Sequence, residues 1–78
     1  MSDLVRMNTI NPGQSAIVKK INAEENMQRR FLDIGLIDDT KIECIGRSPS
    51  GDPSAYLIRG AVIAIRGENC SDIMLQLC

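Results

Sequence analysis

The sequence contains no histidine and no tryptophan, and its aromatic side chains are one phenylalanine and one tyrosine. Histidine is the usual general base near neutral pH, the usual partner of a serine or cysteine nucleophile, and a common metal ligand. Proteins that bind single-stranded nucleic acids commonly stack the bases on exposed aromatic rings. We therefore expect neither an enzyme nor a nucleic-acid-binding module.

An excess of positive charge and long apolar runs are also missing. Nine lysines and arginines stand against ten aspartates and glutamates, and a net charge of −1 is poorly suited to neutralising phosphates. The longest uninterrupted apolar run, Ala61–Ile65, is far shorter than the roughly 20 residues that cross a bilayer. The first residues do not combine a basic region with an apolar stretch, as a signal peptide does. We expect a cytoplasmic protein without direct membrane insertion.

The cysteines, Cys44, Cys70 and Cys78, form an odd and widely spaced set without a Cys-x-x-Cys pair. A secreted disulfide scaffold normally has an even and denser set. We interpret Cys44 and Cys70 as small buried residues and Cys78 as a tail thiol. Three scattered thiolates match no common zinc spacing, so we expect no cofactor and assign no metal ligand and no catalytic residue.

The length of 78 residues, with 44% hydrophobic and 24% charged residues, is typical of one small folded domain spanning 1–78.

The segment Asn11-Pro12-Gly13-Gln14 predicts a type II turn. The apolar residues before this turn, Leu4, Met7 and Ile10, are expected to pack on one end of the fold. Short runs rich in β-branched residues, separated by turn residues, predict strands over 15–21, 41–47, 54–59, 61–66 and 73–77.

One short helix is predicted over about 23–34. Asn22 followed by Glu25 has the pattern of a capping box at the start, and Gly35 predicts a left-handed end with Leu36 folded back onto Phe31. The apolar residues Met27, Phe31 and Ile34 lie on one helical face. Together these elements predict a mainly β fold: a small SH3-like barrel of about five strands with the helix inserted after the first main strand. A closed barrel would leave little exposed strand edge.

Four segments, in their order and spacing, resemble the FeoA family of ferrous iron transport proteins over about residues 8–77. They are Gly13 in its Pro-Gly turn, Arg30-Phe31-Leu32-Asp33-Ile34-Gly35-Leu36, Pro49-Ser50-Gly51-Asp52-Pro53 and Arg59-Gly60-Ala61-Val62-Ile63-Ala64-Ile65-Arg66. The chain departs from the family at Asp38-Asp39, where Pro-Gly is usual.

The resemblance implies an SH3-like fold and a small cytosolic accessory of ferrous iron transport. Its implied partner is a membrane ferrous-iron permease that carries a cytosolic GTP-binding domain, contacted through protein–protein interaction. A related domain forms the C-terminal part of iron- and manganese-dependent repressors. This kinship implies the alternative of a transition-metal-binding, metal-responsive regulatory domain.

The expected partner-contact residues fall into two segments and one arginine. A 100° step per residue places Leu32 off the core face of the helix, where it either covers the following turn or joins an exposed apolar contact with Leu36 and Ile37. The polar loop at 48–53 is either a structural turn or a contact loop, and the arginines form either a solvated surface or a basic patch. The candidate set is Arg29, Leu32, Leu36, Ile37, Ser50, Gly51, Asp52 and Arg59.

Overall fold

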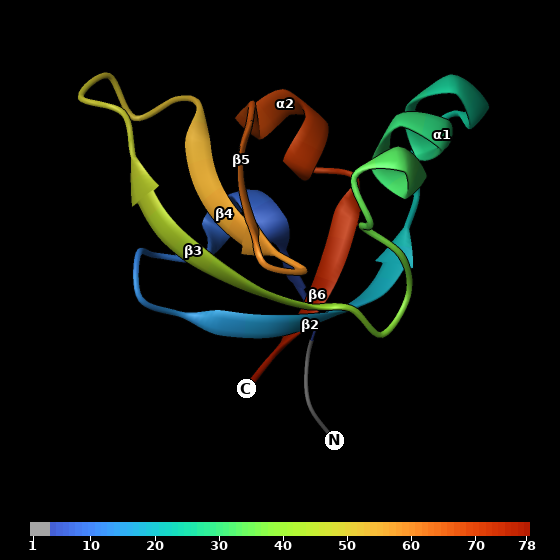
Figure 1. Cartoon of the computed structure of the whole chain (residues 1–78), viewed down its shortest axis with the longest axis horizontal. Coiled ribbons are helices and arrows are strands. Elements are labelled where there is room, and N and C mark those ends of the chain that lie inside the picture. The colour runs from blue at the N-terminus through green and yellow to red at the C-terminus, as the bar shows by residue number, and fades with distance from the viewer. Residues whose placement is uncertain (1–3) are drawn as a thin grey trace.

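The computed structural model describes residues 4–78 and contains one six-stranded antiparallel sheet in the order β1-β6-β2-β3-β4-β5 (Figure 1). The strands are β1 (Val5–Arg6), β2 (Ser15–Ile21), β3 (Lys41–Arg47), β4 (Ser54–Ile58), β5 (Ala61–Ile65) and β6 (Ile73–Leu77). The helices are the 3-10 helix η1 (Met7–Thr9), α1 (Glu25–Asp33) and α2 (Gly67–Cys70). No helix in this part of the chain is long and apolar enough to cross a membrane.

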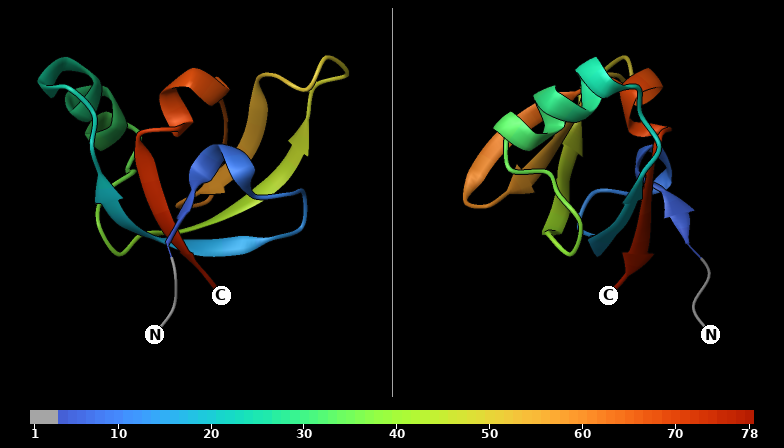
Figure 2. Two further views of the ribbon diagram at one scale, coloured as in Figure 1. Left: turned by 180° about the vertical axis from the view of Figure 1, so that it is seen from behind. Right: turned by 90° about the vertical axis from the view of Figure 1, so that its right-hand side faces the viewer.

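The mainly β fold with one helix after the first main strand is confirmed, and all five predicted strands are present within one residue of their expected ends. The prediction of a closed barrel is wrong, because β1 and β5 are the two edges of the sheet and do not pair with each other within residues 4–78. The added strand β1 is only two residues long and pairs with β6, so it does not reach β5. The sheet curves strongly, and α1 and α2 lie at one end of it (Figure 2).

The core fills the concave side of the curved sheet. Strands β3 and β4 alternate between buried and more exposed residues, as expected for a sheet that packs on one face only. The buried apolar residues are Met7, Ile10, Ala16, Val18, Ala23, Phe31, Leu36, Ile42, Cys44, Tyr56, Ile58, Ile65, Cys70, Ile73 and Leu75. Three apolar residues before the first turn were expected to pack on one end of the fold. Met7 and Ile10 are buried as expected, whereas Leu4 is exposed.

The predicted turn before β2 is present. Gly13 has a φ of 92°, and the Gln14 N–H donates to the Asn11 carbonyl over 3.0 Å, which is the type II geometry. The Gly13 N–H also donates to the Cys44 carbonyl over 2.8 Å and joins the turn to β3.

The start of α1 differs from the prediction, because Glu24 occupies the N-cap position and makes no side-chain capping bond. Asn22 is not the cap, since β2 continues through Ile21, which pairs with Ile73. The Asn22 N–H then donates to the Asp72 carbonyl over 2.7 Å, which keeps Asn22 beside the start of β6. The strand pairing thus overrides the local capping signal.

Candidate functional site

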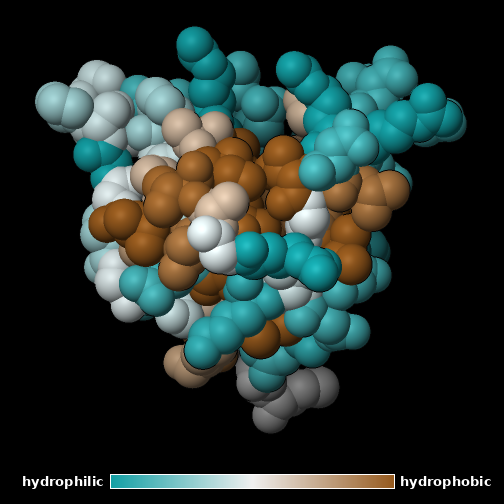
Figure 3. Space-filling model, in the orientation of Figure 1, coloured by the Kyte–Doolittle hydropathy of each residue, from teal (hydrophilic) through white to brown (hydrophobic). Residues whose placement is uncertain are grey.

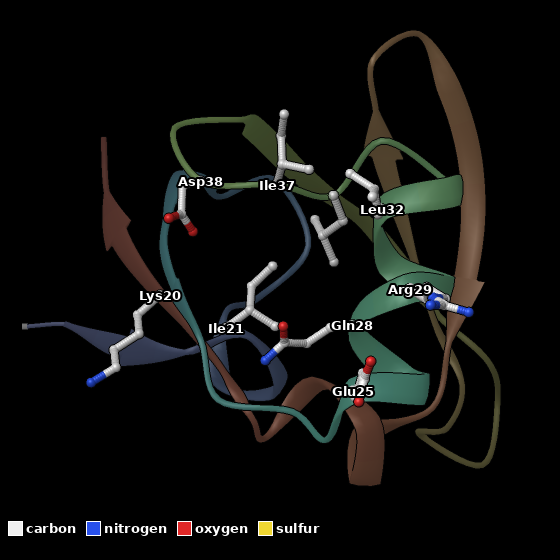
Figure 4. Close-up of a pocket in the computed structure, with 9 residues that line it drawn as sticks. Lys20, Ile21, Glu25, Gln28, Arg29, Leu32, Ile37 and Asp38 are labelled. Carbon is white, nitrogen blue, oxygen red and sulfur yellow. The ribbon is translucent and has the colours of Figure 1, made fainter.

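A groove lies between α1, the end of β2 and the segment that follows α1 (Figure 4). Its volume is about 590 Å³, and its lining combines an apolar centre with charged residues around it. In the close-up, Ile21 and Gln28 point toward each other across the groove, while Lys20 and Arg29 point away from it. The lining residues are Lys20, Ile21, Glu25, Gln28, Arg29, Leu32, Leu36, Ile37 and Asp38.

The end of α1 shapes this groove. The Leu36 N–H donates to the Phe31 carbonyl over 2.8 Å, the Gly35 N–H donates to the Leu32 carbonyl over 3.0 Å, and Gly35 has a φ of 86°. These are the two bonds of a Schellman ending, so the predicted helix end is confirmed. The reversal turns Leu36 into the core and brings Ile37 out beside the groove.

Leu32 is the most exposed apolar residue of the groove, with 59% of its surface accessible, and Ile37 follows with 37%. Leu36 is fully buried, so the expectation that it offers surface to a partner is wrong. The end of α1 directs the Leu36 side chain into the core, where it lies beneath the floor of the groove. The exposed apolar contact is therefore formed by Leu32 and Ile37.

The turn after Ile37 fixes the far wall of the groove. The Asp39 N–H donates to the Val18 carbonyl over 2.6 Å, and Lys19 Nζ lies 3.3 Å from Asp39 Oδ1. The buried Thr40 hydroxyl accepts from the Ile37 N–H over 3.4 Å and donates to the Gly35 carbonyl over 3.3 Å. These bonds tie the segment to β2 and to the end of α1.

Four charged residues of both signs surround the apolar part of the groove: Lys20, Glu25, Arg29 and Asp38. Within residues 4–78 the only ion pair joins Lys19 to Asp39, so none of the four is paired with another described residue. Gln28 is held by its own bond, since Nε2 donates to the Ala23 carbonyl over 2.7 Å. A partner can thus meet an apolar centre with charged groups around it.

Arg59 lies at the tip of the β4–β5 hairpin. Its side chain packs over Gly35 so tightly that a β-carbon at position 35 would lie 2.6 Å from Cδ of Arg59. The hairpin tip therefore contacts the end of α1, which places Arg59 on the same side of the molecule as Leu32 and Ile37 although it does not line the groove.

The loop that contains Ser50, Gly51 and Asp52 lies elsewhere, at the other end of β4, on the opposite side of the view from α1 (Figure 1). Asp52 Oδ1 accepts a hydrogen bond of 2.7 Å from the Gly67 N–H at the start of α2. The Ser50 hydroxyl donates to the Asp52 carbonyl over 3.0 Å. The predicted contact residues therefore form two separate groups, and Asp52 has a structural role.

The cysteines have the positions expected of them, with Cys44 and Cys70 buried and Cys78 exposed. Burial raises the pKa of Cys70 to about 11 and also raises the pKa of Cys44. Among residues 4–78, no three cysteine, aspartate or glutamate side chains come together as a group that could hold a metal ion. The metal-responsive alternative stays a prediction.

Five residues that line the groove were not predicted from the sequence: Lys20, Ile21, Glu25, Gln28 and Asp38. A signal for part of it was present, because Glu25, Gln28, Arg29 and Leu32 follow the i, i+3, i+4, i+7 spacing of one helical face. This face is distinct from the core face and carries one apolar residue among polar ones. The end of β2 lines the groove only because of the tertiary packing, and no local sequence pattern indicates this.

The family model of the FeoA domain matches residues 5–77, which is nearly the whole chain. The chain belongs to the FeoA family. The family is associated with ferrous iron transport, and the resemblance seen in the sequence is confirmed. Among curated proteins, none matches this sequence.

Solved structures show the same fold. The NMR structure of a FeoA-like protein from Clostridium acetobutylicum is 27% identical, with a TM-score of 0.89 over 99% of this chain and 90% of that one. The zinc complex of FeoA from Stenotrophomonas maltophilia, described as an SH3 domain protein, is 16% identical, with a TM-score of 0.81 over 92% of this chain and 89% of that one.

A manganese-dependent transcriptional repressor is also similar, at 18% identity and a TM-score of 0.90, over 100% of this chain and 43% of that one. The SH3-like fold class is confirmed by these structures, although the sheet is open. These three matched proteins are described as a FeoA-like protein, a FeoA protein and a manganese-dependent transcriptional repressor.

Proposed function

We propose that this FeoA-family protein is a cytoplasmic accessory of bacterial ferrous iron transport that acts by contacting the cytosolic GTP-binding domain of a membrane iron permease. Family membership supports the link to ferrous iron transport. The Stenotrophomonas maltophilia relative is described in connection with activation of ferrous iron transport. A protein that acts by contact needs no catalytic group, in keeping with a sequence that has no histidine.

The observation that carries this proposal is the exposed pair Leu32 and Ile37 on a groove with a polar surround. Protein interfaces commonly combine an apolar centre with a polar and charged rim. Leu32 is 59% exposed in the free chain, so it is available to become a buried anchor when a partner covers it. The partner segment we expect carries an apolar side chain for the groove and charges of both signs to meet Glu25, Arg29 and Asp38.

Such a contact regulates a GTPase only if it differs between the nucleotide states. A binding protein shifts a conformational equilibrium by the difference between its affinities for the two conformations. We therefore expect this protein to bind the GTP-binding domain more tightly in one nucleotide state than in the other.

Isothermal titration calorimetry tests the proposal with the isolated GTP-binding domain of a membrane iron permease from the same organism, loaded with GDP or with a non-hydrolysable GTP analogue. We expect binding in at least one state and a loss of at least about ten-fold in affinity for Leu32→Lys, equal to about 1.4 kcal/mol. The matched control is Ile45→Lys, which changes a similarly exposed apolar residue on β3 and should bind normally. Absence of binding in both nucleotide states would contradict the proposal.

A further inference from the structure

The free edge of the sheet at β5 is unusually unprotected. Strand β5 pairs with β4 on one side and with no other strand of the described chain. Its sequence, Ala61–Ile65, has no charged residue and no proline or glycine, the features that normally prevent an edge strand from pairing with another chain. In space-filling view, apolar side chains gather across the middle of the face on which β5 lies (Figure 3).

The hairpin geometry shows which backbone groups this edge offers. Arg59 and Gly60 both have positive φ, at 50° and 86°, so β4 and β5 are joined by a two-residue type I′ turn. The pair that closes such a turn, Ile58 with Ala61, is hydrogen-bonded, and hydrogen-bonded pairs alternate along an antiparallel ladder. The N–H and C=O groups of Val62 and Ala64 therefore point away from β4, toward the free edge.

The side chains of the same two residues lie on the outer face of the sheet. Val62 pairs with Leu57 and Ala64 with Ala55, so four apolar residues form a continuous outer surface on β4 and β5. Val62 is 64% exposed, the highest value among the large apolar residues described. An antiparallel strand added to this edge would cover both the free backbone groups and part of this apolar surface.

We propose that β5 pairs antiparallel with β5 of a second copy of this chain, about a two-fold axis at Ile63. In this register Val62 lies opposite Ala64 of the second copy, and the reverse pair is identical by symmetry. Each pair exchanges two N–H···O=C bonds through the groups that point to the free edge. The two sheets then form one continuous sheet, and Val62 packs beside Ala64 of the second copy on its outer face.

The charges at the two ends of β5 favour a second copy as the occupant. The start of β5 carries one positive charge, Arg59. The end carries Arg66, Glu68 and the Asp52 carboxylate bonded to Gly67, which together give one negative charge. Antiparallel pairing brings the start of one strand to the end of the other, so opposite net charges meet at both ends of the interface.

Sedimentation equilibrium from micromolar to submillimolar concentration tests this pairing on the whole chain. We expect a monomer–dimer equilibrium for the wild type and a monomer for Val62→Lys, which places a charge at the edge. Ala64→Pro removes an N–H that points to the free edge and makes no bond to β4, so this variant should also be monomeric while circular dichroism shows an intact fold. Leu32→Lys, which changes the groove, should remain dimeric. A monomeric wild type, an assembly larger than a dimer, or a dimeric Val62→Lys would overturn the proposal.

A cross-linking experiment tests the register. Opposed Cα atoms in a non-hydrogen-bonded antiparallel pair are about 4.5 Å apart, which is within the range of a disulfide. In a Cys78→Ser background, Ile63→Cys should form a covalent dimer on oxidation, whereas Ile45→Cys on β3 should not. Equal cross-linking of the two variants would exclude the register about Ile63. Binding to the permease domain should be unchanged in Val62→Lys, so this proposal and the proposed function can fail separately.

Discussion

The side chain of Arg59 lies over Gly35, and a β-carbon at position 35 would lie 2.6 Å from Cδ of Arg59. Through this contact the turn between β4 and β5 packs on the glycine that ends α1. The same glycine, at a φ of 86°, sends Leu36 into the core and Ile37 toward the groove. The candidate contact surface therefore depends on one backbone reversal and on the arginine that covers it.

Gly35→Ala is predicted to lower the free energy of unfolding by about 1–2 kcal/mol for the left-handed backbone alone, and further because Arg59 must move. Gly60→Ala is the matched control, since Gly60 has the same φ of 86° but a β-carbon there would meet no heavy atom within 4 Å beyond its chain neighbours. Urea denaturation of both variants measures the difference. Removing the arginine by Arg59→Ala should reduce the cost of Gly35→Ala toward that of Gly60→Ala. Equal costs for the two glycine substitutions in the wild-type background would contradict the contact.

Asp39→Gly is predicted to raise the free energy of unfolding by about 0.5–1 kcal/mol. Asp39 has a φ of 69°, a left-handed conformation that costs a side-chain-bearing residue energy and that glycine adopts freely. The substitution removes the ion pair with Lys19, but both side chains are exposed and such pairs contribute little. Thermal and urea denaturation measure the gain. The neighbouring Asp38→Gly, at a position without positive φ, should give no stabilisation, and a gain of equal size there would refute the explanation.

Asp52→Ala is predicted to destabilise the fold by about 1 kcal/mol, because its carboxylate accepts the hydrogen bond from Gly67 N–H at the start of α2. The adjacent Ser50→Ala, which removes an exposed hydroxyl, serves as the control and should have a smaller effect. Neither substitution should weaken partner binding through the groove, since the loop lies away from α1. A loss of affinity in Asp52→Ala with unchanged stability would instead make this loop the contact.

Stability is predicted to fall as the pH rises from 9 toward 11. Burial raises the pKa of Cys70 from its ordinary value of 9.0 to about 11, so the folded chain keeps a proton that the unfolded chain loses. The contribution of the protonated Cys70 thiol to the free energy of unfolding is complete below pH 9, and it disappears as the pH approaches the pKa of Cys70 in the folded chain. Urea denaturation at a series of pH values measures this loss. Cys78→Ser, which removes an exposed thiol, should leave the profile unchanged. Constant stability across this interval would contradict the burial of Cys70.

Local chemistry predicted most of the elements of this fold. The turn at Gly13 and the end of α1 at Gly35 require only the chemistry of neighbouring residues, and the strands follow from β-branched runs between turns. The prediction that Asn22 caps the start of α1 was wrong, because the pairing of Ile21 with Ile73 holds Asn22 beside β6. The open sheet was missed because the sequence pattern of a strand does not indicate which strands it pairs with, and the pairing leaves β1 and β5 as the edges.

The candidate site was only partly predictable for the same reason. Leu32 stood out because its position on the helix lies off the core face, and this needs only the helical period. The burial of Leu36 follows from the predicted helix ending at Gly35, and this ending places Leu36 in the core rather than on the contact surface. The structural role of Asp52, by contrast, depends on its bond with the distant residue Gly67. Sequence patterns identified exposed and polar residues, but not which of them share one surface.

The measurement that tests the central claim most directly is NMR mapping of the ¹⁵N-labelled protein during titration with the GTP-binding domain of the permease. We predict that the largest changes in amide chemical shift occur at Leu32, Ile37 and the other residues around the groove. The loop at 48–53 and the residues of β5 should change little. Changes confined to that loop or to β5, with the groove unaffected, would contradict the account.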